Sequence, residues 1–499
     1  MNKKKTLIAV IIAAVVLVGV MLLLLFLPKG DGDREAATID EGAKVDISTD
    51  KEGVHQVKVE TNEKGEVDNN SYGTLMEYVP AQIKSIHIEN TKGTFDVLSN
   101  TPDGEATEYT LKGYEGFDLQ VGVPDQIANA AASLSFTRIA SPSGENKADF
   151  GLDKPRAQVM VTYTDSTKAV IAVGNDAPQG AGTYVQFGSE DTIYLCDTDT
   201  VSAFDFGITD LISLTINDSA DTTDNSQASS IKISGSGFDK EIELVPNTSE
   251  KNSASYRMKT PVECYANENE SSLIDGGIRG LYANSVKMVN PSSAQLSELG
   301  LSSPYAKVSA VYPDTTVELF GSKPDSEGNI YLMVKGGKVV YQISSEKTPW
   351  VTTSYEKLVS EYALYPKMSS LIGVSVKTDA TYDFSLTTKT STRTDDEGEE
   401  ITTTTTSVFY GDKEIQLGDF SAFYDDLTLI KLADANTESA NGNAVLTVTY
   451  TYDDASSDKV EFYAVSNDRY LAVINGKALG HSYKADVTRA SNSVKELVK

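Results

Sequence analysis

The chain has 499 residues, 40% of them hydrophobic, which is enough for about three domains and excludes a wholly disordered protein. Its 72 acidic and 43 basic residues give a formal net charge of −29. A chain this acidic repels a phosphate backbone, so we expect no nucleic-acid partner. Three histidines (His55, His87 and His481) and two cysteines are too few for a structural zinc cluster. We predict no metal, no cofactor and no catalytic residue.

The N-terminus carries one long apolar segment. Residues 7–27 are apolar apart from one glycine, and as a helix they would span about 30 Å, the thickness of a bilayer's hydrocarbon core. Three lysines precede the segment, and such lysines stay in the cytoplasm. We predict that residues 1–29 are a cytoplasmic stub and single-pass transmembrane anchor in the plasma membrane, with residues 30–499 extracytoplasmic. The alternative is a cleaved secretory signal, whose apolar region is usually shorter.

The charge follows this division. Residues 1–29 hold four lysines and no acid, which leaves 39 basic and 72 acidic residues, a net charge of −33, in the remainder. Residues 30–73 are rich in Asp, Glu, Lys and Gly, a composition typical of a polar tether, in which a short strand pair can form.

An internal repeat follows the tether. The sequence GLDKPRAQV at 151–159 recurs as GLSSPYAKV at 300–308, and the match continues through Tyr-x-Asp to a paired glycine, Gly174 and Gly321. A third, eroded copy at 445–454 keeps the Tyr-x-Asp ending and lacks the Gly-Leu-x-x-Pro corner. The repeat predicts three modules, at residues 74–210, 211–368 and 369–499.

Each copy has the pattern of an antiparallel meander. Apolar and polar residues alternate at 159–163 and 308–312, the period of a half-buried strand, and turn residues and return strands follow. The predicted fold class is α+β: an N-terminal transmembrane helix, then three tandem β-rich modules, each an antiparallel meander with short helices. Opening strands are predicted at 83–88, 214–216 and 372–376, and helices at 126–134, 271–282, 350–362, 420–433 and 487–497.

The corner before each meander has a physical interpretation. Glycine can adopt a positive φ as the chain turns, leucine fills the core, and proline precedes a strand, where its missing N–H does no harm. These structural repeat residues are Gly151, Leu152, Pro155, Gly300, Leu301 and Pro304.

With these features the sequence resembles the domain-of-unknown-function 4340 family. The resemblance rests on an Ile-x-Ser-Ile-x-Ile strand at 83–88, the corner at 150–159 and a Tyr-Val/Ile-Tyr-Leu hairpin at 184–195. It covers residues 74–375 and, more weakly, the last 60 residues. The resemblance implies a bacterial envelope protein, and some members accompany ABC transporter components of the gliding-motility auxiliary type. The family has no established catalytic residues, so the resemblance assigns none.

Acidic runs at 197–199, 395–400 and 453–454 are the best candidates for calcium ligands. None has the ligand spacing of a calcium loop, and the first is replaced by Ser344 and Glu346 in the second copy. We interpret them as solvated loops and leave calcium binding open.

The cysteines and histidines carry no motif. Cys196 aligns with Ile343 of the second copy, which indicates a buried core position, and a disulfide to Cys264 would join two modules. Neither His87 nor His481 has a Ser, Cys or carboxylate at motif spacing. We interpret these residues as structural.

Tyrosine is abundant, with 25 residues against one tryptophan. Several tyrosines recur at strand positions, where tyrosine is favoured, although a ligand platform is the alternative. Trp350 is predicted to be a core anchor. Residues 387–406, rich in threonine, predict a long hairpin with a charged tip, either a contact element or a solvated protrusion.

Repeated architecture without a repeated polar constellation favours a non-catalytic protein. We expect an interaction or accessory subunit of an ABC-type envelope complex, with protein partners in the envelope. The alternative is a surface module that binds cell-wall glycan or another extracellular ligand. An enzyme is the third possibility, which a pocket gathering His87 or His481 with carboxylates would favour. The partner, the small-molecule ligand and the oligomeric state do not follow from the sequence.

Overall fold

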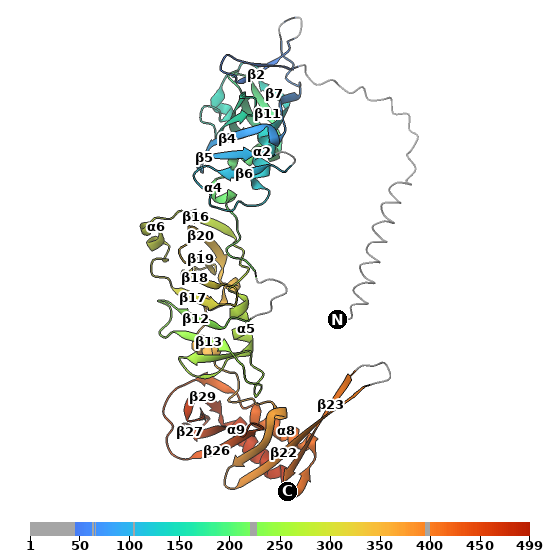
Figure 1. The fold of residues 1–499 in the computed structure, drawn as a ribbon. Helices are drawn as coiled ribbons and strands as arrows, with labels where there is room; N and C mark the ends of the chain where they lie inside the picture. Colours follow the sequence, from blue (N-terminus) through green and yellow to red (C-terminus); the bar gives the residue numbers. More distant parts are fainter. Residues whose placement is uncertain (1–44, 62–63, 65, 103–104, 220–226, 395–399) are drawn as a thin grey trace. The chain divides into compact units, whose positions relative to one another are not determined.

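The computed structural model describes residues 45–499 except 62–63, 65, 103–104, 220–226 and 395–399 (Figure 1). The protein is mostly β, with 44% strand and 20% helix, so the predicted α+β class is wrong. The predicted anchor at residues 7–27 lies outside the described residues. Among the helices that the structure does describe, none is long and apolar enough to cross a membrane.

The described residues form two compact units, one made of residues 45–83 with 130–201 and the other of 84–129 with 202–499. The first unit contains a two-stranded hairpin, β1-β2, and antiparallel strands in the order β3-β7-β11-β10-β9-β8. The strands are β1 (Val45–Thr49), β2 (His55–Val59), β3 (Gly73–Glu77), β7 (Ser133–Ser141), β8 (Ala157–Tyr163), β9 (Lys168–Asp176), β10 (Thr183–Phe187) and β11 (Ile193–Cys196). The helical turns are η1 (Pro80–Gln82), η2 (Lys147–Phe150), η3 (Pro178–Gly180) and α3 (Thr198–Val201).

The second unit opens with three antiparallel strands, β4 (Ile83–Asn90), β5 (Gly93–Asn100) and β6 (Glu108–Leu111), followed by α2 (Val123–Ala132) at the border of the units. Two nine-stranded antiparallel sheets follow, in the orders β15-β14-β13-β12-β17-β18-β19-β20-β16 and β24-β23-β22-β21-β26-β27-β28-β29-β25.

The bounds of the first of these sheets are β12 (Ser230–Ser234), β13 (Ile242–Pro246), β14 (Tyr256–Thr260), β15 (Cys264–Tyr265), β16 (Ser285–Val289), β17 (Ala306–Val311), β18 (Thr316–Gly321), β19 (Asn329–Val334) and β20 (Val339–Ser344). Those of the second are β21 (Leu371–Lys377), β22 (Thr381–Thr394), β23 (Glu400–Tyr410), β24 (Lys413–Ile415), β25 (Leu432–Ala435), β26 (Ala444–Tyr452), β27 (Ser457–Ala464), β28 (Arg469–Ile474) and β29 (Lys477–Tyr483). The helical segments are η4 (Ser202–Asp205), α4 (Ile208–Leu211), α5 (Glu268–Gly276), α6 (Ser293–Glu298), η5 (Ser345–Lys347), η6 (Pro349–Val351), α7 (Tyr355–Leu358), η7 (Met368–Ser370), α8 (Leu417–Thr428) and α9 (Lys484–Leu497).

One strand order occurs three times. The run β8-β9-β10-β11-β7 has the same connectivity as β17-β18-β19-β20-β16 and β26-β27-β28-β29-β25. Each run contains a meander of four strands. The last strand of the meander pairs with the strand that precedes the whole meander in the chain, namely β7, β16 or β25. The module boundaries at 210/211 and 368/369 stay predictions.

Two predicted elements are wrong. Residues 214–216 form no opening strand, because Leu214 and Ile216 exchange backbone hydrogen bonds with residues 281–283 instead. β12 holds the equivalent place in its sheet. The helix predicted at 350–362 is divided into η6 and α7, since the β-branched residues Thr352 and Thr353 lie between them and such residues disfavour a helix.

Other predictions are confirmed. The predicted helix at 487–497 is part of α9, and that at 420–433 corresponds to α8, which packs against α9. Three aromatic residues of α8 are buried in the core of the β21–β29 sheet: Phe420, Phe423 and Tyr424. There Phe420 and Phe423 contact Phe384 of β22. The threonine-rich segment forms the predicted hairpin, β22-β23, which extends beyond its sheet in Figure 1. Its tip, residues 395–399, lies outside the described residues.

Candidate functional site

The corner residues lie where a helical turn passes into the first strand of a meander. Gly151 and Gly300 follow η2 and α6 with φ of +72° and +71°. Leu152 and Leu301 are buried, 6% and 3% exposed. Pro155 and Pro304 each lie two residues before the strand. These six residues therefore start the meander and hold no group that performs chemistry.

A second recurring feature joins the copies to other parts of the chain. The first strand of each meander leads into Tyr-x-Asp, and the tyrosines, Tyr163, Tyr312 and Tyr452, are buried (0%, 6% and 1% exposed). In each copy a basic side chain from outside the meander reaches this sequence. We call this arrangement the Tyr-x-Asp clamp; its basic residues are His55, Arg279 and Lys251.

In the second copy the basic side chain is Arg279. Its guanidinium carbon lies 4.7 Å from the centre of the Tyr312 ring, and its Nη1 and Nη2 donate to the two carboxylate oxygens of Asp314 at 3.1 and 2.8 Å. This forked hydrogen bond from Arg279 lowers the pKa of Asp314. Arg279 is therefore held between an aromatic face and a carboxylate, the geometry that suits arginine better than lysine.

In the third copy the basic side chain comes from the loop between β13 and β14. Lys251 Nζ lies 4.6 Å from the centre of the Tyr452 ring and 2.7 Å from Asp454 Oδ2. Hydrogen bonding to Lys251 holds the pKa of Asp454 well below its usual range. The Tyr452 hydroxyl donates to Asp458 Oδ2 at 2.7 Å.

In the first copy the basic side chain is His55, at the start of β2. His55 Nε2 lies 2.8 Å from the Tyr78 hydroxyl and 3.1 Å from Thr167 Oγ1. The Tyr78 ring stacks on Tyr163 with centroids 3.7 Å apart, and Asp165 accepts hydrogen bonds from Thr167. His55 is 8% exposed, so it is buried at this clamp.

We expect His55 to make the first unit sensitive to acid. Burial lowers its pKa below 6.5, against the opposing attraction of Asp165. As the pH falls through 6.5, the unfolded chain takes up a proton that the folded chain does not, so the free energy of unfolding decreases down to the folded pKa and then levels. Thermal unfolding above and below pH 6.5 measures this. A His55→Gln variant should lose that part of the pH dependence; an unchanged profile would contradict the assignment.

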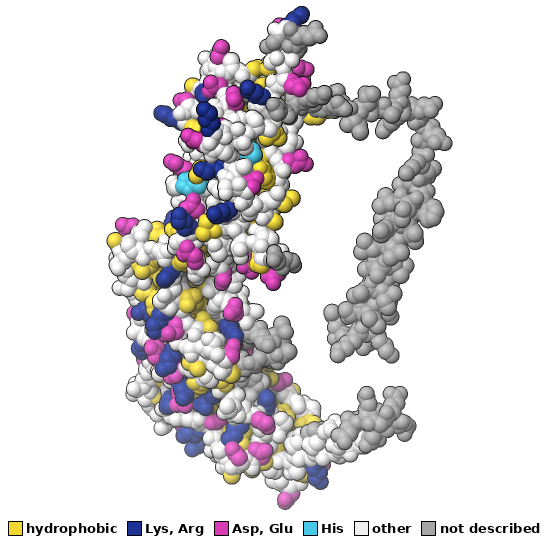
Figure 2. Space-filling model, turned by 45° about the horizontal axis from the view of Figure 1, so that its top comes forward, with side chains coloured by type: hydrophobic (Ala, Val, Ile, Leu, Met, Phe, Trp, Pro, Cys, Tyr) yellow, Lys and Arg dark blue, Asp and Glu magenta, His cyan; other side chains and the backbone are white. Residues whose placement is uncertain are grey.

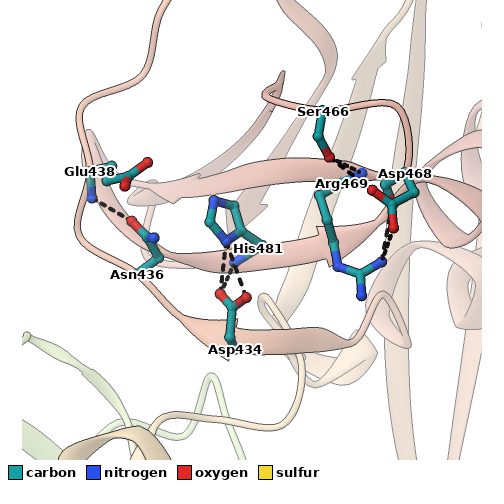
Figure 3. A network of polar contacts seen from close by, with 7 residues as sticks. All are labelled: Asp434, Asn436, Glu438, Ser466, Asp468, Arg469 and His481. Carbon is teal, nitrogen blue, oxygen red and sulfur yellow. Dashed lines mark hydrogen bonds and ion pairs between the residues drawn. The ribbon is translucent and has the colours of Figure 1, made fainter.

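The other two histidines pair with aspartates across neighbouring strands. His87 and Asp96 are register partners on β4 and β5, with Nδ1 and Oδ1 2.7 Å apart. His481 and Asp434 are partners on β29 and β25, 2.9 Å apart (Figure 3). In Figure 3 the hydroxyl of Ser466 is bonded to Asp468 and not to the imidazole. Each pair is a polar cross-strand contact, which stabilises a sheet without a nucleophile.

The acidic runs are engaged within the chain. Asp197 Oδ2 accepts from the backbone and hydroxyl of Thr200, at 2.8 and 2.9 Å, and so caps α3. Asp454 belongs to the third clamp, and residues 395–399 lie outside the described residues. No group of three or more potential metal-ligating side chains occurs in the described part of the chain.

The cysteines are free thiols. Cys196 is fully buried, and burial raises its pKa. Burial also raises the pKa of Cys264 to about 12. Both thiols therefore stay protonated at neutral pH and are poor nucleophiles.

Four of the recurring tyrosines are buried, and Tyr184 and Tyr331 are half-buried. Tyr163, Tyr194 and Tyr312 are at most 6% exposed, and Tyr341 is 7% exposed. They belong to the cores of their sheets, which disfavours the ligand-platform interpretation of these positions.

A charged cavity lies beside the third clamp. It has a volume of about 300 Å³ and is lined by β14, β15, residues 360–365 and the turn between β28 and β29. Three basic side chains line it, Lys251, Arg257 and Lys477, against two acidic ones, Glu263 and Asp458. The lining is therefore net positive in a chain of charge −29, whose acidic and basic side chains are otherwise interspersed over the face in Figure 2.

Sequence reasoning did not find this cavity or the basic residues of the clamps. Lys251 and Arg279 belong to no motif, and they lie 203 and 35 residues from the aspartates they pair with. The sequence shows the repeated Tyr-x-Asp, but it does not show which basic side chain contacts each copy.

The comparisons with known proteins give one match. The family described as a domain of unknown function, DUF4340, matches residues 110–275, which run from the end of β6 to α5. No curated protein and no solved structure matches the chain. The match lies within the region over which the sequence predicts the resemblance, and it is shorter than that region. Residues 110–275 therefore match the DUF4340 model, and the predicted family resemblance is confirmed over these residues.

Proposed function

We propose that the protein is a non-catalytic accessory subunit of an ABC-type envelope complex, attached to the membrane by residues 7–27, with the rest of the chain outside. One observation carries the non-catalytic part. The polar residues that the copies share, the Tyr-x-Asp sequences, make contacts within the same chain: Asp314 and Asp454 pair with Arg279 and Lys251, and Asp165 accepts from Thr167. Shared catalytic residues would instead face a common pocket. The ABC association rests on the family resemblance alone.

The β22-β23 hairpin is the part of this chain that we assign to partner contact. β22 pairs with β21 only up to Ser385, and β23 pairs with β24 only from Val408. Beyond these residues the two strands form a ribbon whose exposed residues include Thr387 and Lys389. A ribbon of this kind can add to the edge of a partner's sheet through backbone hydrogen bonds.

Co-purification of the full chain from detergent-solubilised membranes tests the proposal. We expect an ATPase or permease subunit of a transporter to copurify. Replacing residues 389–405 by Asn-Gly keeps the Thr388–Thr406 pair and closes the hairpin with a two-residue turn. This variant should fold and lose the partner, whereas a variant with an unrelated apolar segment in place of residues 7–27 should keep it. A full chain that emerges alone would overturn the accessory role.

A second candidate function is ligand binding outside the membrane, which the charged cavity favours. Five charged side chains line the cavity, together with Tyr265 and Tyr365. Retention of the full chain on purified wall glycan would support the glycan alternative, and no retention would reject it.

A further inference from the structure

The charged cavity has the donor groups of an anion site. Arg257 lies on β14, with its guanidinium carbon 5.5 Å from the centre of the Tyr265 ring. Its only ion pair among the described residues is a long contact, 3.3 Å, from Nη2 to Glu263 Oε1. Its Nε is buried and has no hydrogen-bond partner in the described chain. A guanidinium has five N–H donors, and the Arg257 side chain is 41% exposed and donates to Glu263 through Nη2, so its other terminal N–H groups can reach a ligand in the cavity.

The acidic residues of the cavity, in contrast to Arg257, have hydrogen-bond partners on both carboxylate oxygens. Glu263 accepts from both Arg257 and Lys477. The two carboxylate oxygens of Asp458 accept from the Tyr452 hydroxyl and from Asn475 Nδ2, at 2.7 and 2.8 Å. Since both carboxylates are engaged and three basic side chains line the cavity against two acidic ones, the cavity suits an anion and not a cation.

The remaining wall is apolar. Val262, Leu364 and Leu479 line the cavity and are 8%, 5% and 4% exposed. A bare inorganic anion would leave these side chains without a contact, whereas an aliphatic group would bury apolar surface against them.

We propose that this cavity binds a small organic carboxylate, with the carboxylate at Arg257 and a short aliphatic group against Val262, Leu364 and Leu479. A carboxylate accepts a forked pair of hydrogen bonds from a guanidinium, which is stronger than a single contact. The proposal is independent of the accessory role, since the cavity and the β22-β23 hairpin share no residue.

Titration calorimetry of the full-length protein with N-acetyl-leucine, and with N-acetyl-leucinamide as the uncharged control, tests this site. We expect the carboxylate to bind and the amide to bind at least about tenfold more weakly, the value of one charge-assisted contact. Equal binding of the two, or no binding of the carboxylate, would overturn the proposal.

Three variants locate the site. Arg257→Met should weaken binding of the carboxylate at least about tenfold, for the same contact. Lys335→Met removes an equally charged residue from an exposed pair with Glu318 and should leave binding unchanged. Ala478→Phe places a ring in the cavity and leaves Arg257 in place, so it should abolish binding even if Arg257→Met unfolds the protein. Unchanged binding by Ala478→Phe would show that the ligand binds elsewhere and would overturn the assignment.

Discussion

Replacing Trp350 by alanine should lower the free energy of unfolding of the part of the chain that contains the β12–β20 sheet by about 4 kcal/mol. Trp350 is 0% exposed and is the largest fully buried side chain of the described residues. Its removal leaves a cavity that the surrounding side chains cannot fill. Its Nε1 also donates to the Gly277 carbonyl at 2.9 Å, so the substitution leaves a buried acceptor without its donor.

Chemical denaturation followed by circular dichroism measures this loss, because the substitution removes the only tryptophan fluorophore. Trp350→Phe is the matched control. It keeps most of the apolar contact and loses the hydrogen bond, so it should cost about 1–2 kcal/mol. An alanine variant as stable as the phenylalanine variant would show that Trp350 does not anchor this core.

The second large effect concerns the glycine that recurs in the first two meanders. A Cβ on Gly174 would lie 2.1 Å from the Phe150 carbonyl oxygen and 3.0 Å from Leu152 Cγ. The first of these atoms belongs to the backbone of the corner and cannot move alone. We expect Gly174→Ala to cost about 3 kcal/mol or more, the upper range for overpacking.

Gly321 is the control within the same chain. A Cβ there would meet Val351 Cγ2 at 3.2 Å and Trp350 Cη2 at 3.4 Å, both side-chain atoms that can shift. Gly321→Ala should therefore cost about 1 kcal/mol. Thermal unfolding of the two variants against the parent chain compares them, and equal losses would contradict this account of the repeated glycine.

The contrast also explains how much of the fold could be predicted. Gly174 and Gly321 share a position in the sequence although they meet different neighbours, and a repeated glycine is a pattern that is visible in a sequence. Alternation in 159–163 and 308–312 likewise predicted strands β8 and β17. The alternating pattern of a strand depends on residues that are close together in the sequence.

The failures have a different cause. The fold class was wrong because the helical periods at 271–282 and 350–362 were interrupted, the first at Gly276-Gly277 and the second by β-branched residues. The strand expected at 214–216 instead pairs with residues 281–283, a choice that depends on tertiary contacts. The predicted anchor lies outside the described residues, so the structure neither supports nor opposes it.

The site was harder to predict than the fold. Arg257, Glu263 and Lys477 meet because β14, β15 and β29 come together, and the pairing of Lys477 with Glu263 joins residues 214 positions apart. No spacing of residues in the sequence predicts a contact between residues so far apart. The corner residues, which the repeat made prominent, proved to start strands and do not line the cavity.

The central claim is that the chain acts by binding partners in the envelope. Amine cross-linking of the full-length protein in intact membranes, followed by mass spectrometry, tests it most directly. We predict cross-links from Lys389 and its neighbours on the β22-β23 hairpin to a transporter subunit, and their loss when residues 389–405 are replaced by Asn-Gly. Cross-links confined to the chain itself, from a protein shown to be folded, would contradict the claim.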